Sequence, residues 1–163
     1  MNTAVRQPPN FGYFIFPDES SYVGGVEDGR SQGLGVYTGP RRRGEFAGVW
    51  QGGYEVSGVY TSATTGPSSS SALTFGGSSS PQPLSTYEGQ WQQGRRHGLG
   101  VERRNDWEYR GEWSQGFRGR YGVRQSAISE AKFCGTWTTG LQDGYGVETY
   151  GDGSNKMLFL IIV

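Results

Sequence analysis

The chain has 163 residues, a formal net charge of zero, 29 glycines and a hydrophobic share of only 33%. So few aliphatic residues exclude a conventional core of Leu, Ile and Val, and the aromatic residues, 14% of the chain, must supply most of the buried surface. One histidine and one cysteine exclude a His/Cys metal centre and an intramolecular disulfide, and the neutral charge by itself argues against a strongly basic membrane or nucleic-acid binder.

The chain begins with a polar lead, residues 1–12, which contains the pair Pro8-Pro9. Phe14, Ile15 and Phe16 follow and predict a first short strand, because bulky apolar and β-branched side chains favour extended backbone.

Five copies of one short pattern come next, spaced 24, 41, 22 and 24 residues apart, and they begin at Tyr22, Phe46, Tyr87, Tyr109 and Phe133. The third copy reads Tyr87-x-Gly89-x-Trp91-x-x-Gly94-x-x-x-Gly98-x-Gly100. A unit repeated over most of a chain predicts an array of identical supersecondary elements rather than a globular enzyme.

The spacing within a copy predicts a β-hairpin. Tyr109, Gly111 and Trp113 alternate with period 2 and therefore share one face of a strand, while the glycine three residues after each tryptophan suits a turn with positive φ. The later glycines, such as Gly98 and Gly100, leave a bare surface on which aromatic rings can lie. The expected fold is all-β, an elongated, single-layer, open-ended antiparallel sheet of stacked hairpins. Its structural positions are Tyr22, Gly24, Phe46, Gly48, Trp50, Tyr87, Gly89, Trp91, Gly94, Tyr109, Gly111, Trp113, Gly116, Phe133, Gly135, Trp137 and Gly140.

Three copies depart from the pattern. Val26 replaces the tryptophan of the first copy, which is typical of a terminal cap. The second copy has Ser57 and Val59 where the later glycines are due, and the fourth has Arg120 in the earlier glycine position.

The repeats divide into two groups, 13–60 and 87–154, the latter ending in the start of a sixth copy. Residues 61–86 between them are rich in Ser, Gly and Pro, and we expect a flexible loop there, since such a segment buries little apolar surface.

Residues 155–163 are a divergent apolar tail, in which Lys156 stands where the next aromatic is due. The seven apolar residues from Met157 to Val163 are too few to span a bilayer, which needs about 20. We prefer a truncated array ending in foreign residues, which would leave an unpaired edge after the fifth hairpin. The alternative is an edge strand.

The pattern resembles a MORN repeat, and several segments are similar to the amino-terminal repeats of junctophilins. The similar segments are 110–126, 140–153 and 94–102, together with Thr38-Gly39-Pro40 and Tyr54-Glu55-Val56. Junctophilins hold endoplasmic or sarcoplasmic reticulum close to the plasma membrane. The resemblance therefore implies a module on the cytoplasmic face of the plasma membrane at reticulum contacts, with anionic phospholipid of the inner leaflet and a voltage-gated calcium channel as partners. Further repeats and the membrane anchor of that family are missing here, so we expect no bridging of membranes by this chain alone.

Arginines are the candidate binding residues. Residues 95–124 hold eight arginines against four acids, and 41–43 are a triple arginine. The guanidinium group suits bidentate phosphate contact, and a basic patch favours an anionic leaflet. Each arginine by itself is better explained as a solvated residue whose stem covers an aromatic ring, but the cluster favours phospholipid. The candidates are Arg41, Arg42, Arg43, Arg95, Arg96, Arg103, Arg104, Arg110, Arg118, Arg120 and Arg124.

No catalytic pattern accompanies these residues. His97 has no Cys, Ser or acid at motif spacing and is interpreted as a turn residue, and Cys134 as an inert, outward thiol. We therefore expect no enzyme, cofactor, metal or nucleic acid, and the absence of a secretory segment favours a cytosolic compartment. Two hypotheses stay open: a phospholipid-binding membrane-apposition module, and a scaffold that docks a channel or another peptide without significant lipid contact.

Overall fold

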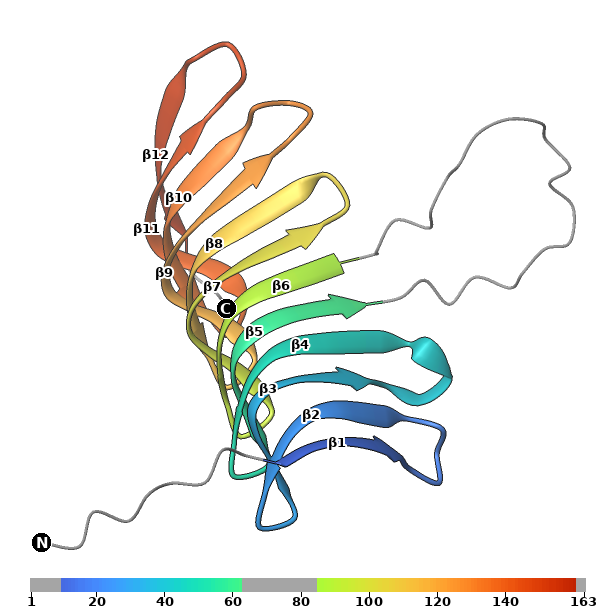
Figure 1. Cartoon of the computed structure of the whole chain (residues 1–163). Helices are drawn as coiled ribbons and strands as arrows, with labels where there is room; N and C mark the ends of the chain where they lie inside the picture. Colours follow the sequence, from blue (N-terminus) through green and yellow to red (C-terminus); the bar gives the residue numbers. More distant parts are fainter. Residues whose placement is uncertain (1–9, 63–84, 161–163) are drawn as a thin grey trace, which may run out of the picture.

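The computed structural model describes residues 10–62 and 85–160. These residues form one antiparallel sheet of twelve strands, paired in sequence order, which twists and curves along its length (Figure 1). The strands are β1 Asn10–Ile15, β2 Ser21–Glu27, β3 Arg30–Thr38, β4 Gly44–Gln51, β5 Tyr54–Ser62, β6 Ser85–Gln92, β7 Arg95–Arg104, β8 Trp107–Ser114, β9 Phe117–Ser126, β10 Lys132–Thr138, β11 Leu141–Thr149 and β12 Asn155–Leu160. A short 3-10 turn, η1 (Pro40–Arg42), joins β3 to β4. The predicted all-β array of stacked hairpins is confirmed.

Each repeat is a hairpin, and its two ends define two edges of the sheet. The tight turns within repeats, such as Gln93-Gly94, lie along one edge, which we call the turn edge. The connections between repeats, including η1, lie along the other edge, the inter-repeat edge (Figure 1). Gly94, Gly116 and Gly140 have φ values of 74°, 91° and 89°, so their predicted role in turns with positive φ is confirmed.

The rings gather on one surface, the aromatic face, as the alternation predicts. The four tryptophans of the repeat pattern, Trp50, Trp91, Trp113 and Trp137, each pack edge-on between the first aromatic residue of their own repeat and that of the repeat before. Trp113, for example, lies 5.4 Å from Tyr109 and 5.0 Å from Tyr87, centroid to centroid. The buried rings are Tyr22, Phe46, Trp50, Tyr87, Tyr109, Trp113, Phe133 and Trp137. Trp91 contacts both halves of this core, so the two groups of repeats share one continuous layer.

Paired glycines beneath the rings allow this packing. Gly111 lies opposite Gly100 and Gly122, and a Cβ built on Gly111 would lie 2.6 Å from the Gly122 Cα and 2.7 Å from the Tyr109 hydroxyl. Only a residue without Cβ lets the ring of Tyr109 cover the backbone there.

Gly111→Ala is therefore expected to lower the free energy of unfolding by about 1–2 kcal/mol, because the added methyl overpacks a site closed by backbone and ring. The matched control is Gly119→Ala on β9, where a Cβ meets its nearest atom at 3.6 Å and changes stability little. Urea denaturation of both variants measures the difference. Equal denaturation midpoints for the two variants would contradict the conclusion that the absence of a Cβ at Gly111 allows the ring of Tyr109 to cover the backbone.

Two glycine assignments within the repeats were wrong. In the second repeat Gly58, not Ser57 or Val59, lies opposite Gly48, because this hairpin returns with one residue fewer than the others. Gly98 does not serve as a bare platform. It has a φ of 62° within a bulge, and Arg120, which replaces it in the fourth repeat, keeps a positive φ of 30°.

The amino-terminal boundaries also need correction. Asn10, Phe11 and Gly12 belong to β1 rather than to a polar lead, and Phe16 lies in the turn that follows. β1 pairs along the whole of β2, so the first repeat with its Val26 is not the terminal strand pair of the sheet. His97 lies in β7 opposite Gln90, not in a turn.

Four residues that were assigned to the expected flexible loop belong to strands instead. Thr61 and Ser62 continue β5, and Ser85 and Thr86 begin β6, and the two strands pair directly. Ser62 Oγ lies 2.9 Å from Ser85 Oγ where the strands end. The remainder of the predicted loop, residues 63–84, lies outside the described residues.

The carboxyl-terminal apolar run forms an edge strand, which was the alternative and not the preferred expectation. Asn155–Leu160 pairs in register with β11, so the expected unpaired edge after the fifth hairpin is wrong. Leu158 packs against the aromatic core, while Met157 and Phe159 point to the opposite face and are exposed. An apolar run can form a strand with this alternation even without the aromatic residue that Lys156 replaces.

Candidate functional site

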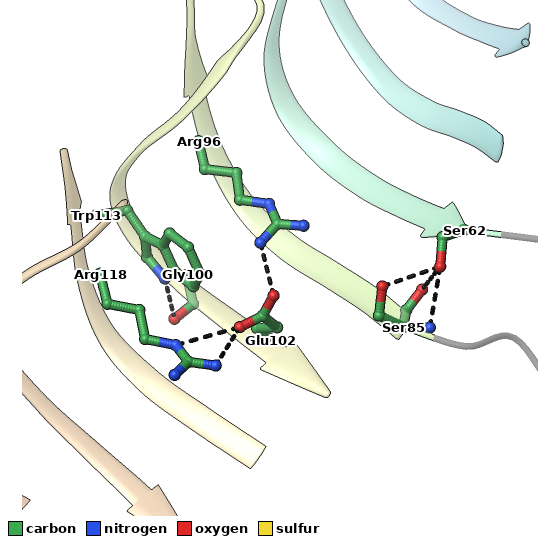
Figure 2. A network of polar contacts seen from close by, with 7 residues as sticks. All are labelled: Ser62, Ser85, Arg96, Gly100, Glu102, Trp113 and Arg118. Carbon is green, nitrogen blue, oxygen red and sulfur yellow. Dashed lines mark hydrogen bonds and ion pairs between the residues drawn. The ribbon is translucent and has the colours of Figure 1, made fainter. Parts of the chain in front are cut away.

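The most strongly paired arginines lie on the aromatic face, where they hold a buried carboxylate. Glu102 stands between Tyr87 and Tyr109 across the strands and is 8% exposed. Arg96 Nη1 donates to its Oε1 at 2.7 Å, and Arg118 Nη2 donates to its Oε2 at 2.6 Å (Figure 2). We call these three residues the Arg-Glu-Arg bridge.

The rings complete the surroundings of this bridge. The Arg96 guanidinium carbon lies 5.0 Å from the centroids of both Tyr87 and Trp113, and Arg118 stacks in the same way over Tyr109. Such stacking is a cation–π contact and also covers the rings from water. Arg96 and Arg118 therefore cover rings as expected, but they do so with the guanidinium rather than the stem, and they are paired with Glu102 rather than solvated.

The bridge sets the ionisation of Glu102. Burial alone would raise the pKa of this carboxyl, but hydrogen bonds from Arg118 and Arg96, with their positive charge, outweigh burial and hold the pKa below its usual value. Burial also raises the pKa of Tyr87 and of Tyr109 to about 12, so both hydroxyls stay neutral at physiological pH.

A second group of arginines lies around the start of β8. Arg103 and Arg110 are paired on the face opposite the rings, and Arg124 stacks over Trp107. Glu108 accepts from Arg110, and Arg103 Nε donates to it at 2.8 Å. The hydrogen bond from Arg110 holds the pKa of Glu108 below its usual value. The Arg124 guanidinium lies 3.8 Å from the ring centroid of Trp107.

The remaining candidate arginines are more exposed and less engaged. Arg95 donates to Gln115 at 3.2 Å, and Arg120 is 78% exposed with Glu112 only at 3.9 Å. Arg104 and the triple arginine 41–43 are exposed, and within residues 10–62 and 85–160 none of them has an ion-pair partner. These last four lie on the inter-repeat edge.

The structure therefore does not bring the predicted cluster together as one patch. Arg95, Arg96, Arg118 and Arg120 lie near the turn edge, whereas Arg104 and residues 41–43 lie near the inter-repeat edge. Strand reversal in each hairpin separates residues that are near in sequence, so a local charge excess is shared between two edges.

Two functional features were missed by sequence reasoning. Glu102 and Glu108 were counted only as opposing charge, although each neutralises two arginines. The alternation could have placed Glu102 on the aromatic face, because it lies two residues after Gly100. The second feature is a hollow near Val26, which the missing tryptophan could have indicated.

The described segments contain no helix with the length and apolar character needed to cross a membrane. Cys134 is exposed on the face opposite the rings, in the outward position expected for it.

The comparison with protein families agrees with the geometry. The MORN repeat matches residues 22–41, 46–66, 87–108, 109–128 and 133–155, which together exceed half of the chain. The five matches begin at the same residues as the five copies of the sequence pattern and correspond to the five hairpins. MORN repeats are non-catalytic modules that generally contact membranes or proteins, and no enzyme family is indicated. The chain belongs to the MORN-repeat family.

Proposed function

We propose that this chain is the plasma-membrane-binding part of a junctophilin-like tether, which contacts anionic phospholipid of the inner leaflet through exposed arginines on the inter-repeat edge. The observation that carries the proposal is the triple arginine 41–43. Its three residues are exposed and lie in one short turn, and no acid pairs with them among the described residues. Guanidinium groups suit phosphate, and each basic residue near an anionic surface contributes on the order of 1 kcal/mol.

The backbone of this turn supports the same assignment. Arg41 and Arg42 both have positive φ, 53° and 54°, although neither is glycine. Residues in this region cost about 1 kcal/mol or more each and cluster at functional sites. The Arg42 and Arg43 amides donate hydrogen bonds to the carbonyls of Gly39 and Pro40, and these bonds hold the turn that carries the three arginines.

The expected result is that replacing Arg41, Arg42 and Arg43 together with glutamine weakens binding to vesicles containing phosphatidylserine about a hundredfold, since three contributions of about 1 kcal/mol are lost. The charge-preserving triple lysine variant is the matched control and should bind within about threefold of the parent. Flotation with and without phosphatidylserine, at low and high salt, measures both the affinity and its screening.

A parent chain that does not float with phosphatidylserine would overturn the lipid proposal. A triple glutamine variant that floats as well as the parent would exclude this patch, and Arg95→Gln with Arg120→Gln then tests the turn edge. Arg96 and Arg118 are unsuitable for such a test, because their loss would break the Arg-Glu-Arg bridge.

A second candidate function is protein docking, with a channel segment or another peptide as partner. The observation that favours it is an aromatic hollow at the first repeat, which is lined by five aromatic side chains and by none of the residues of the triple arginine.

A further inference from the structure

One position in each repeat decides whether a guanidinium covers the aromatic face. It lies cross-strand from the tryptophan position and is occupied by Arg96 in the third repeat and Arg118 in the fourth. Each of these arginines stacks over the first aromatic of its own repeat and the tryptophan of the next, as Arg96 does over Tyr87 and Trp113. The array thus forms the same cation site twice.

The corresponding position in the first repeat is Ser31, which lies cross-strand from Val26. The two rings are present, since Tyr22 and Trp50 pack edge-on at 5.3 Å, much as Tyr87 and Trp113 do at 5.0 Å. Serine is too short to cover them. The space is an open hollow of about 450 Å³, within the range of ligand sites, and the rings that line it belong to Phe14, Phe16, Tyr22, Tyr37 and Trp50.

The charge at this hollow suits a cation. Glu55, which lies cross-strand from Trp50, is half-buried and lines the hollow, and within the described part of the chain it has no ion-pair partner. Arg30 also lines the hollow but is exposed, and it holds the hairpin position of Arg95, whose guanidinium contacts Gln115 rather than the rings. A carboxylate beside several aromatic faces is the arrangement that recognises organic cations.

We infer that this hollow binds the guanidinium group of an arginine side chain presented by a partner protein. The guanidinium would stack over Tyr22 and Trp50, as Arg96 does over the equivalent rings, and Glu55 would supply the opposite charge. The hollow extends across the aromatic face from Gly29 and Gly53 at the turn edge to Phe16 and Tyr37 toward the inter-repeat edge, and none of residues 41–43, which carry the proposed lipid contact, lines it. The two proposals can therefore fail independently.

The test is an NMR titration of the indole N–H signals with the blocked peptide acetyl-Gly-Arg-Gly-amide. The expected result is a saturable shift of the Trp50 signal, with the Trp137 signal unchanged. Ser31→Arg should abolish the shift, because the chain then places its own guanidinium over the rings. Glu55→Gln should weaken binding about threefold.

The matched control is Gln142→Arg, which adds the same charge at the same hairpin position of the fifth repeat and should leave binding intact. Thermal unfolding of Ser31→Arg shows that loss of binding is not loss of fold. No shift of Trp50 in the parent, or an undiminished shift in Ser31→Arg, would overturn the inference.

Three further outcomes decide which occupant is correct. A peptide with citrulline in place of arginine should bind at least about threefold more weakly, and equal binding would exclude a cation site. Phosphocholine binding more tightly than the arginine peptide would assign the hollow to a lipid headgroup and overturn the inference. Binding that appears only after Arg30→Ala would mean that Arg30 fills the hollow, which would also overturn it.

Discussion

Trp113→Ala is expected to lower the free energy of unfolding by about 3–5 kcal/mol, the largest loss from a single substitution in this sheet. The indole is 4% exposed, packs against Tyr87 and Tyr109, and lies beneath the Arg96 guanidinium. Its Nε1–H donates to the Gly100 carbonyl at 3.3 Å, so alanine also removes a hydrogen bond between repeats. In an array each repeat is stabilised by its neighbours, and the substitution weakens the contact between the third and fourth repeats.

Trp107→Ala is the matched control for this experiment. Trp107 is the same residue type on the same strand, but it is 37% exposed and carries only Arg124 over its ring. We expect a loss of about 1 kcal/mol from it. Urea denaturation followed by circular dichroism gives both values, and hydrogen exchange should show faster opening of β6 to β9 in Trp113→Ala. Similar losses of stability for the two tryptophans would contradict the conclusion that Trp113 stabilises the sheet by packing between Tyr87 and Tyr109.

Glu102→Gln is expected to destabilise the protein by about 2–3 kcal/mol at neutral pH, because it leaves two guanidinium groups without their shared carboxylate. The side chains of Arg96 and Arg118 are 22% and 25% exposed, so water compensates only part of this loss. Glutamine has the shape of glutamate, and the variant therefore removes charge rather than volume.

The pH dependence separates charge from packing in this variant. The pKa of Glu102 is lower in the folded chain than its usual value of 4.5, so its ionised form contributes stability above that pH, and this contribution is lost as the pH falls through the folded pKa. The difference between parent and Glu102→Gln should therefore be largest near pH 7 and shrink below about pH 4. Glu112→Gln, whose carboxylate is 41% exposed and 3.9 Å from Arg120, should show little effect at either pH. A difference that stays constant down to about pH 3 would refute the ionic role of Glu102.

Much of the fold follows from short-range pattern. The hairpin, its turn glycine and the shared face of Tyr109, Gly111 and Trp113 all depend on the two-residue alternation of a strand and on which residues accept positive φ. The exposure of the triple arginine likewise follows from its place in a turn.

The boundaries that failed depend on pairing rather than on residue type. Asn10 and Gly12 are weak strand formers but lie along β2, and Lys156 interrupts the aromatic pattern but still pairs with Glu148 across β11. A neighbouring strand supplies hydrogen bonds to any extended backbone, so these residues form strands that their propensities do not favour.

The sequence by itself determined the period, the face of each ring, the turns and the non-catalytic family, because all of these repeat within one hairpin. Only the tertiary structure decided which charged residues lie close together. Hairpin bulges and reversals set which residue lies cross-strand from which, and this register brings Arg96 and Arg118 to Glu102 while leaving Ser31 beside an open hollow. Electrostatic contacts depend on distances between strands, which a linear spacing does not contain, and so the arrangement of the charged residues follows only from the stacked hairpins.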